Sequence, residues 1–243
     1  MMTTGNGERP MRTVLLTLSV PEPALKTLRA EFPHLRFVVP GGDTDGEGRY
    51  RVSPQAPTTD ELRDADALIG WNIDAESLAH ATNLQWVHAA SAGIEQFDAE
   101  AFRGRNIMLT NSRGVSAPNM AEHVIGMMIA LARRFPSLVQ AQAKREWRDD
   151  QTHREVRELQ GQTALIVGMG EIGRAIAQRL AAFAMKVHGV RRRPKAEIPA
   201  GFDAMFGTDA LPEALAGADH VIVTLPDTPH TRGLIGAAAF AAM

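Results

Sequence analysis

The sequence contains no cysteine among its 243 residues. Disulfide bonds, thiolate catalysis and zinc–thiolate sites are therefore excluded, and we single out no residues as metal ligands. A chain without cysteine is compatible with the reducing cytoplasm, where we expect this protein to act.

Aromatic residues, net charge and long apolar runs are also scarce. One Tyr and three Trp are too few for an obvious base-stacking surface, and a net charge of −2 provides no basic field for nucleic acid. No apolar run approaches the roughly 18 residues that a membrane-spanning helix needs. The short apolar run at 13–20 predicts a first β-strand; a secretory segment is the alternative, but no small-residue cleavage site follows it. We therefore expect neither nucleic acid nor a membrane as a partner.

Short apolar runs alternate with helix-like stretches through most of the chain. This alternation predicts parallel sheets that are covered by helices on both faces. The expected fold class is α/β, with two doubly wound parallel-sheet domains, which we place at 11–112 and 113–243. Residues 41–60 are polar and rich in Gly and Pro, so we expect a long loop there.

The clearest helix is expected at 116–134. Ser116 is a residue type that caps helices, and Pro118 suits the first turn. Five apolar side chains recur on one side and predict the face that packs into the core: Met120, Val124, Met127, Met128 and Leu131. The charged stretch at 140–162 is expected to face solvent.

The strongest functional signal is a glycine-rich turn that joins an apolar strand at 164–167 to a helix. Gly168 permits the tight turn, Gly170 lets the backbone approach a pyrophosphate, and Gly173 lets the helix and strand pack closely. The amides of this turn, including those of Glu171 and Ile172, and the positive end of the helix would face the anion. The alternatives are a plain strand–helix turn and a site for a methyl-donor nucleotide.

An arginine run follows the next expected strand, at 186–190. A site selective for NAD usually places Asp or Glu about 20 residues beyond the glycines, where it binds the ribose 2′-OH. This chain has Arg191 and Arg192 instead, and guanidinium groups can bind a 2′-phosphate that a carboxylate would repel. We therefore expect NADP or NAD as the cofactor, with NADP favoured; a solvated basic loop is the alternative.

The loop after the strand expected at 220–225 should border the same cofactor site, because ligands bind at the carboxyl ends of parallel strands. This adds three residues as candidates for the wall of that site: Leu225, Pro226 and Thr231.

Four ordered segments together resemble the D-2-hydroxyacid dehydrogenases, a family that includes glyoxylate/hydroxypyruvate reductases. They read SAGIE, NMAEHVIGMMIALAR, LQGQTALIVGMGEIGRAIA and LPDTPHTRGLI, and the resemblance covers about 80–240. It implies a flavodoxin-like substrate domain at 11–112, a Rossmann domain that binds NAD(P) at 113–243, and a cleft between the two. It also implies hydride transfer between the nicotinamide cofactor and a small 2-oxo or D-2-hydroxy acid, and a homodimer built through the second domain.

On the family pattern, SAGIE forms the loop that binds the substrate carboxylate. Ser91, Ala92 and Gly93 would then present their backbone N–H groups to the substrate. Trp71 follows the strand DALIG and is expected either to face the substrate or to pack inside the fold.

Two residues resemble catalytic groups of the family without matching their context. His230 lies in the pattern T-P-H-x-x-G, but its flanks match another turn of the family, in which this position is variable. Arg113 lies in a run one residue shorter than the family's N-x-x-R-G pattern. We assign no catalytic residue before Met243, because family members place the catalytic Arg, Glu and His later.

We expect only four of the roughly six strands of a Rossmann sheet. The sequence therefore resembles a C-terminally truncated dehydrogenase with an incomplete Rossmann domain and little or no turnover. The alternative from another class is a non-catalytic dinucleotide-binding regulatory module.

Overall fold

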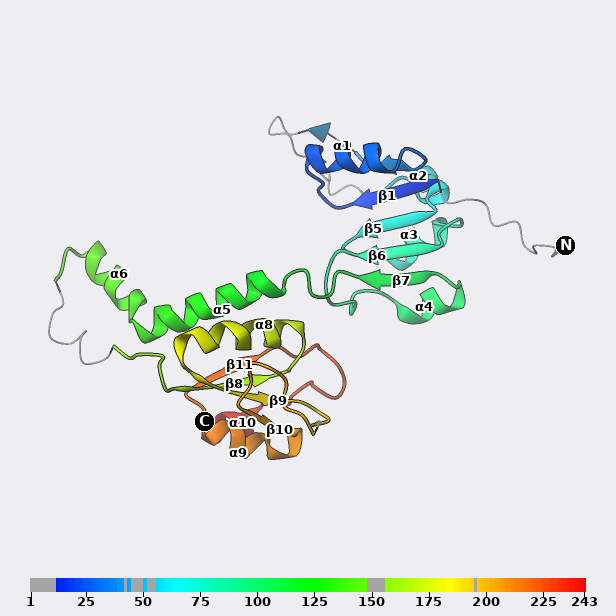
Figure 1. Ribbon diagram of the computed structural model, residues 1–243. Helices are drawn as coiled ribbons and strands as arrows, with labels where there is room; N and C mark the ends of the chain where they lie inside the picture. The colour runs from blue at the N-terminus through cyan, green and yellow to red at the C-terminus, as the bar shows by residue number, and fades with distance from the viewer. Residues whose placement is uncertain (1–11, 42, 45–49, 52–55, 148–155, 195) are drawn as a thin grey trace. The chain divides into compact units, whose positions relative to one another are not determined.

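The structure is a computed structural model that describes residues 12–41, 43–44, 50–51, 56–147, 156–194 and 196–243 (Figure 1). Contacts divide the chain into unit 1, Met1–Arg113, and unit 2, Gly114–Met243, one residue beyond the expected boundary. Each unit is built on its own parallel sheet with helices packed against it, which confirms the predicted α/β fold class.

Unit 1 contains a five-stranded parallel sheet in the order β2-β1-β5-β6-β7, the flavodoxin-like order 2-1-3-4-5 when its own strands are counted. The strands are β1 (Thr13–Thr17), β2 (Arg36–Val38), β5 (Ala67–Gly70), β6 (Trp86–Ala89) and β7 (Met108–Asn111). The helices are α1 (Glu22–Glu31), α2 (Thr59–Asp64), α3 (Ala75–His80) and α4 (Ala99–Gly104). Side chains alternate between the two faces of β1, so Leu16 packs toward α1, whereas Leu15 packs with residues of α2, α3 and α4.

The stretch expected to be one long loop, 41–60, is more structured than predicted. A short antiparallel pair forms between β3 (Asp43–Thr44) and β4 (Tyr50–Arg51). Thr58 then starts α2 with a capping box, because its hydroxyl accepts the amide of Glu61 and its own amide donates to the Glu61 carboxylate. The prediction of an uninterrupted loop over 41–60 was wrong at β3 and β4, whereas α2 begins only at the end of that stretch.

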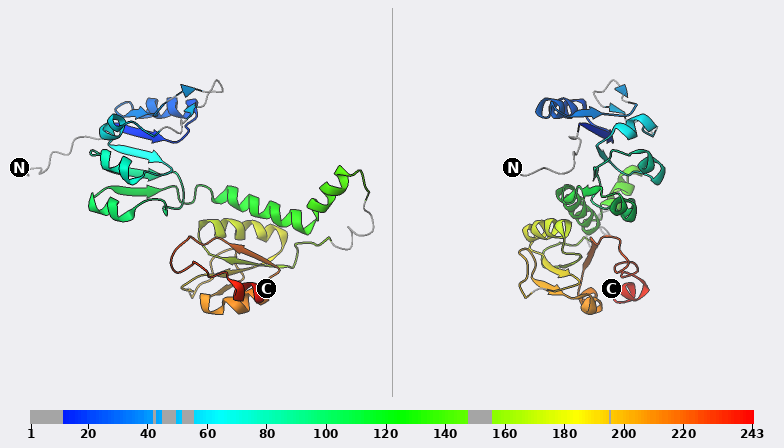
Figure 2. Two further views of the ribbon diagram at one scale, coloured as in Figure 1. Left: turned by 180° about the vertical axis from the view of Figure 1, so that it is seen from behind. Right: turned by 90° about the vertical axis from the view of Figure 1, so that its right-hand side faces the viewer.

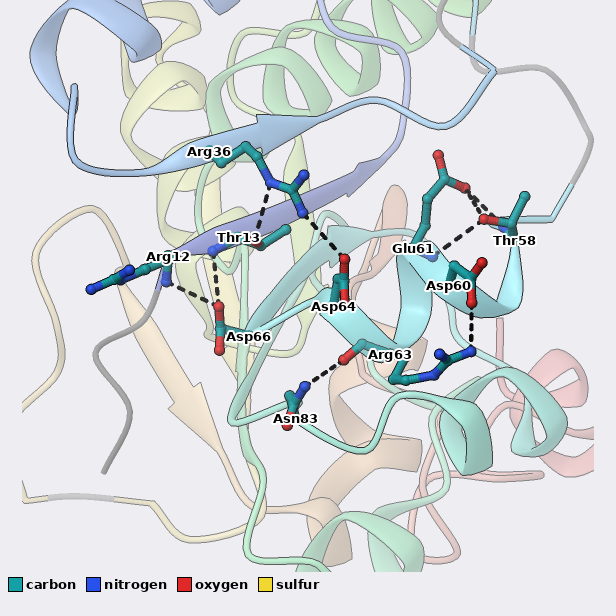
Figure 3. Close-up of polar contacts among 10 residues, drawn as sticks. All are labelled: Arg12, Thr13, Arg36, Thr58, Asp60, Glu61, Arg63, Asp64, Asp66 and Asn83. Atoms are coloured by element: carbon teal, nitrogen blue, oxygen red, sulfur yellow. Dashed lines mark hydrogen bonds and ion pairs between the residues drawn. The ribbon is translucent and has the colours of Figure 1, made fainter. Parts of the chain in front are cut away.

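An aspartate directly before a strand fixes the start of the neighbouring strand in both units. In unit 1, Oδ2 of Asp66 accepts the amides of Arg12 at 3.0 Å and Thr13 at 2.9 Å (Figure 3). In unit 2, Asp219 accepts the first amide of β8 at 2.8 Å, and Asp203 accepts an amide of β9 at 2.7 Å. Asp66 differs in being only 1% exposed, and its Oδ1 has no partner among the described residues.

Unit 2 contains a four-stranded parallel sheet in the order β10-β9-β8-β11. The strands are β8 (Thr163–Val167), β9 (Lys186–Val190), β10 (Ala204–Phe206) and β11 (His220–Val223). The helices are α5 (Ala117–Ala132), α6 (Phe135–Ala143), α8 (Glu171–Leu180), α9 (Leu211–Ala216) and α10 (Ala237–Ala241), with single 3-10 turns at Ala181–Phe183 and Thr208–Ala210. Within this unit, α5 and α8 lie side by side on one face of the sheet, and α9 and α10 lie on the other (Figures 1 and 2).

Helix α5 buries a different face from the one predicted. Its buried residues are Ala117, Ala121, Ile125, Met128 and Ala132. Of the predicted core stripe only Met128 is buried, while Met120, Met127 and Leu131 are 45%, 51% and 59% exposed. Small alanines allow α5 to approach α8 closely, and this packing decides which face is buried. Ser116 does not cap the helix with its side chain, because its backbone is already in the right-handed helical conformation.

Helix α6 follows α5 after a bend of 65°. Among the described residues, no single helix has the length and apolar character to cross a membrane, and only α5 and α6 taken together would pass that test. Phe135 and Val139 of α6 are exposed, as are Met120, Met127 and Leu131 of α5.

Candidate cofactor and substrate sites

Gly168 joins the carboxyl ends of three strands of unit 2. Its φ of 114° lies in the region that favours glycine, and its amide donates to the carbonyl of Val190 at 3.0 Å. The hydroxyl of Thr224, directly after β11, donates to the Gly168 carbonyl at 2.7 Å. A Cβ on Gly168 would lie 2.9 Å from the Thr224 carbonyl group. The turn thus holds the ends of β8, β9 and β11 at one edge of the sheet.

The other two glycines of the motif have different surroundings. A Cβ on Gly173 would lie 2.1 Å from the Gly168 carbonyl oxygen, so this glycine allows α8 to pack against the turn. A Cβ on Gly170 would meet no described atom within 4 Å beyond its chain neighbours. Gly170 begins α8 without a side-chain cap, so the amides of the first turn keep no side-chain partner. Open space beside unpaired amides fits the diphosphate of a dinucleotide.

Glu171 and Ile172 lie in the first turn of α8 and have separate roles. Glu171 pairs with Arg174, and its carboxylate sits at the positive end of the helix. Ile172 is partly buried against the core of unit 2. Both contribute a backbone amide at the helix start, as predicted from the motif, while their side chains are used within the unit.

The remaining predicted cofactor residues belong to the loops that follow β9 and β11. Arg191 directly follows β9 and is half-buried, and its amide donates to the Phe206 carbonyl at 3.1 Å; Arg192 is exposed. Leu225 packs against the core. The Thr231 hydroxyl donates to the Pro226 carbonyl at 2.6 Å, so Thr231 holds the turn together. These loops share the carboxyl edge of the sheet with Gly168, because the four strands are parallel and β8 is central.

In unit 1, the carbonyl groups of the loop 91–93 are tied back to the protein. The Gly93 carbonyl accepts the Ser91 hydroxyl at 2.6 Å, the Ala92 carbonyl accepts the side-chain amide of Asn111 at 2.6 Å, and the Ser91 carbonyl accepts the amide of Ser112 at 3.1 Å. Among the described residues, no hydrogen bond has the backbone amide of Ser91, Ala92 or Gly93 as its donor. The loop therefore presents three unpaired N–H groups, which suits the binding of an anion such as a carboxylate.

Trp71 lies beside this loop. Its side chain is 56% exposed, so packing inside the fold, one of the two expectations, does not describe it. Gln96 donates its side-chain amide to the Trp71 carbonyl at 2.9 Å and to the Ser91 hydroxyl at 2.8 Å. Gln96 and Asn111 were not predicted as site residues: no motif links Gln96 to Trp71, 25 residues away, or Asn111 to Ala92, 19 residues away.

The two residues that resemble catalytic groups stand apart from other charged groups. His230 and Arg113 are both exposed, and in the described part of the chain neither side chain has a hydrogen bond or an ion pair. The structure therefore gives no carboxylate partner to either residue.

Comparison with protein families supports this description of unit 2. Residues 125–243 match the model of the D-isomer specific 2-hydroxyacid dehydrogenase NAD-binding domain. D-3-phosphoglycerate dehydrogenase of Mycobacterium bovis is 31% identical over 199 residues, which cover 81% of this chain and 36% of that protein. This chain thus spans about a third of the length of the curated relatives it matches.

Solved structures extend the similarity to both units. A D-isomer specific 2-hydroxyacid dehydrogenase family protein from Aeromonas salmonicida is 32% identical, with a TM-score of 0.74 and a match to 95% of this chain and 69% of that one. A D-isomer specific 2-hydroxyacid dehydrogenase from Xanthobacter autotrophicus, solved with NADPH and MES, is 25% identical with a TM-score of 0.69, over 96% of this chain and 69% of that one.

Proposed function

The chain belongs to the D-isomer specific 2-hydroxyacid dehydrogenases, and from this premise we propose that it serves hydride transfer between a nicotinamide cofactor and a small 2-oxo or D-2-hydroxy acid. The observation that carries the proposal is the open space at Gly170 beside the unpaired amides of α8. When bound, the cofactor would supply or accept the hydride, while the protein binds and orients both reactants.

The two units would divide the binding between them. In unit 2, the amides at Gly170, Glu171 and Ile172 would hold the diphosphate, and the loops after β9 and β11 would flank the rest of the cofactor. In unit 1, the unpaired amides of 91–93 would hold the carboxylate of the acid. This arrangement uses backbone atoms for both anions, so it recognises charge and shape at each site.

Isothermal titration calorimetry of the 243-residue polypeptide with NADPH and NADH tests cofactor binding. We expect saturable binding and a rise of the melting temperature with either cofactor, because a ligand that binds the folded state stabilises it. A flat titration on a sample shown to be folded by its near-UV circular dichroism would overturn the proposal.

We propose that the cofactor is preferentially NADP(H). Arg191 and Arg192 replace the carboxylate expected of an NAD-selective site, and a relative of 25% identity was solved with NADPH. Arg191→Asp should weaken NADPH binding at least tenfold and leave NADH binding nearly unchanged, since a lost phosphate–guanidinium pair is worth about 1.5–3 kcal/mol. Arg133→Asp is the matched control, because it makes the same change in net charge. Arg133 lines a hollow together with Gln160, which lies before the amino end of β8 and thus at the opposite edge of the sheet from Gly168. Equal losses for both cofactors would contradict the assignment.

We also propose that residues 1–243 alone bind the cofactor with little or no turnover. His230 is exposed and has no described carboxylate partner, while His220 is bonded to Gln162 at 2.6 Å inside unit 2. Losing a general acid–base group typically costs about 10²–10⁴-fold in rate. Measurable NADPH-dependent reduction of glyoxylate or hydroxypyruvate by the purified polypeptide would overturn this part.

A homodimer built through unit 2 completes the proposal. The apolar surface shared by α5 and α6, which we define by Met120, Met127, Leu131, Phe135 and Val139, is 45–62% exposed and is the kind of patch that marks an interface. Light scattering coupled to size exclusion should give the mass of a dimer, and Met127→Glu should give a monomer that still binds cofactor. A wild-type monomer at all concentrations tested would contradict it.

A further inference from the structure

A chain of polar side chains crosses strands β6 and β7 just before the loop 91–93. The indole N–H of Trp86 donates to the Thr110 hydroxyl at 2.8 Å. Nδ1 of His88 lies 2.8 Å from the same hydroxyl, and Nε2 of His88 lies 3.0 Å from the Ser112 hydroxyl. The Ser112 hydroxyl in turn donates to the Ala89 carbonyl at 3.3 Å. The four bonds link side chains on one face of the sheet, toward the carboxyl end of β6.

The groups at the two ends of this series of hydrogen bonds decide which member donates and which accepts at each step. An indole N–H can only donate and a carbonyl can only accept, so Thr110 accepts from Trp86 and Ser112 donates to Ala89. Each hydroxyl has a single hydrogen. Ser112 donates its hydrogen to the Ala89 carbonyl, and Thr110 can donate its hydrogen to Nδ1 of His88. Ser112 can then only accept from the ring, which requires a hydrogen on Nε2. With the hydrogen on Nδ1 instead, the Thr110 hydroxyl would lose its acceptor and Ser112 its bond to Ala89.

We propose that His88, carrying a ring hydrogen on Nε2, is a positioning residue for the loop 91–93. It acts through Ser112, whose backbone amide donates to the carbonyls of both Ala89 and Ser91 at 3.1 Å. The ring thus fixes the residue that holds the start of the loop. His88 does not touch the acid itself. The inference rests on the carboxylate-binding role proposed for 91–93.

The chain also relates the loop to the rest of unit 1. Trp86 is partly buried against the core between the sheet and α1, so the donor end of the chain is anchored in packed side chains. His88 pairs with Thr110 in the strand register, which places the ring and both hydroxyls on the same face. Packing under the sheet is thereby connected to the geometry of the loop by directed hydrogen bonds.

The tautomer is the first test. Two-bond ¹H–¹⁵N correlation spectra of the 243-residue polypeptide at pH 8, above the ordinary histidine pKa of about 6.5, report which ring nitrogen carries the hydrogen. We expect Nε2 of His88 to be protonated and Nδ1 to be unprotonated. A hydrogen on Nδ1, or a mixture of the two forms, would overturn the proposed direction.

Two substitutions test the two hydrogen bonds of the His88 ring separately, because each substitution keeps only one of them. In His88→Gln the side-chain amide replaces Nε2 and can still donate to Ser112; in His88→Asn the side chain replaces Nδ1 and can still accept from Thr110, but it is too short for Ser112. Exchange of the Ser112 amide with solvent should therefore stay near wild type in H88Q and rise about five- to tenfold in H88N, the change expected for one lost hydrogen bond. Equal exchange in the two variants would overturn the positioning role.

Oxalate titration followed at the amides of Ser91, Ala92 and Gly93 separates this inference from the function beneath it. We expect binding by the wild type and H88Q and several-fold weaker binding by H88N. No oxalate binding by the wild type would overturn the carboxylate role of the loop, whereas the tautomer and the Ser112 exchange would still decide the role of His88. Equal oxalate affinity in H88Q and H88N would contradict the link between His88 and the loop.

Discussion

The two units start their strands alike and end them differently. At the amino edges, Asp66 in unit 1 and Asp219 in unit 2 each precede a strand and accept the first amide of the strand beside it. At the carboxyl edges, unit 2 shapes its turn by omitting side chains at Gly168, Gly170 and Gly173. Unit 1 shapes the loop 91–93 by hydrogen bonds that its three carbonyls accept, two of them from side chains and one from a backbone amide.

Under the proposed function, the two units would present backbone amides to an anion in two different ways. In unit 2 the amides are free because they begin a helix, and glycine clears the approach to them. In unit 1 the carbonyls of the loop have partners within the unit, and its amides have none among the described residues. The arrangement in unit 2 depends on space left by glycine, so added side chains should weaken anion binding there. The arrangement in unit 1 depends on particular polar side chains, so their removal should weaken it.

The largest effect is expected at Gly173. A methyl group there would lie 2.1 Å from the Gly168 carbonyl oxygen, which is backbone and cannot move without opening the turn. Gly173→Ala should lower the free energy of unfolding of unit 2 by about 3 kcal/mol and abolish NADPH binding. Urea denaturation followed by NMR measures each unit separately. Gly217→Ala, where the added carbon meets no described atom within 4 Å, is the control and should be nearly neutral.

Substituting Ala for the aspartate at the amino edge of each sheet should lower the free energy of unfolding of the two units by different amounts. Asp66 is 1% exposed and serves two amides, whereas Asp219 is exposed and serves one. Asp66→Ala should lower the free energy of unfolding of unit 1 by about 2–3 kcal/mol, and Asp219→Ala that of unit 2 by about 1 kcal/mol. The same denaturation experiment applies. Equal costs would mean that burial of the carboxylate adds nothing to this arrangement.

Gly170 separates binding from stability. Its surroundings are open and its backbone, with φ −81° and ψ −162°, is accessible to any residue. Gly170→Ala should therefore leave the free energy of unfolding within about 0.5 kcal/mol of wild type, the usual range for a surface change. NADPH affinity should fall about tenfold or more, because the methyl group occupies the space proposed for the diphosphate. Unchanged affinity in calorimetry would place the diphosphate elsewhere.

The smallest effect is expected in the loop of unit 1. Asn111→Ala removes the donor to the Ala92 carbonyl, which lies at the surface and can bind water instead. The free energy of unfolding should fall by no more than about 1 kcal/mol. Oxalate affinity should nevertheless weaken several-fold, since the loop loses one of the bonds that orient its amides. A loss of stability as large as that of Gly173→Ala would show that the loop carries the fold as well.

Local patterns in the sequence predicted much of this molecule. The glycine motif could be placed because strand, turn and helix are contiguous, and the structure gives each of its three glycines separate surroundings. The family suggested by four short segments was confirmed by the comparisons. Whether the residues of the motif bind the cofactor remains a prediction that the proposed titrations would test.

Features that depend on distant residues were not predictable. Helix α5 is apolar on more than one side, and only the close packing of its alanines against α8 decides that Met127 and Leu131 face outward. Asn111 reaches the loop from the end of β7, and no spacing rule connects it to Ala92. Helix α4, which Asp98 caps, was not predicted.

The tied-back carbonyls of 91–93 have a consequence for how the substrate range of such a chain could drift. Under the proposed carboxylate role of the loop, recognition through main-chain atoms would survive the replacement of Ala92 by most other residues, because no side chain of the loop would contact the acid. Substitutions of residues that would contact the rest of a substrate would thus leave the binding of its carboxylate unchanged. The substrate range could therefore change through successive substitutions elsewhere in the site, while the contact with the carboxylate is kept throughout.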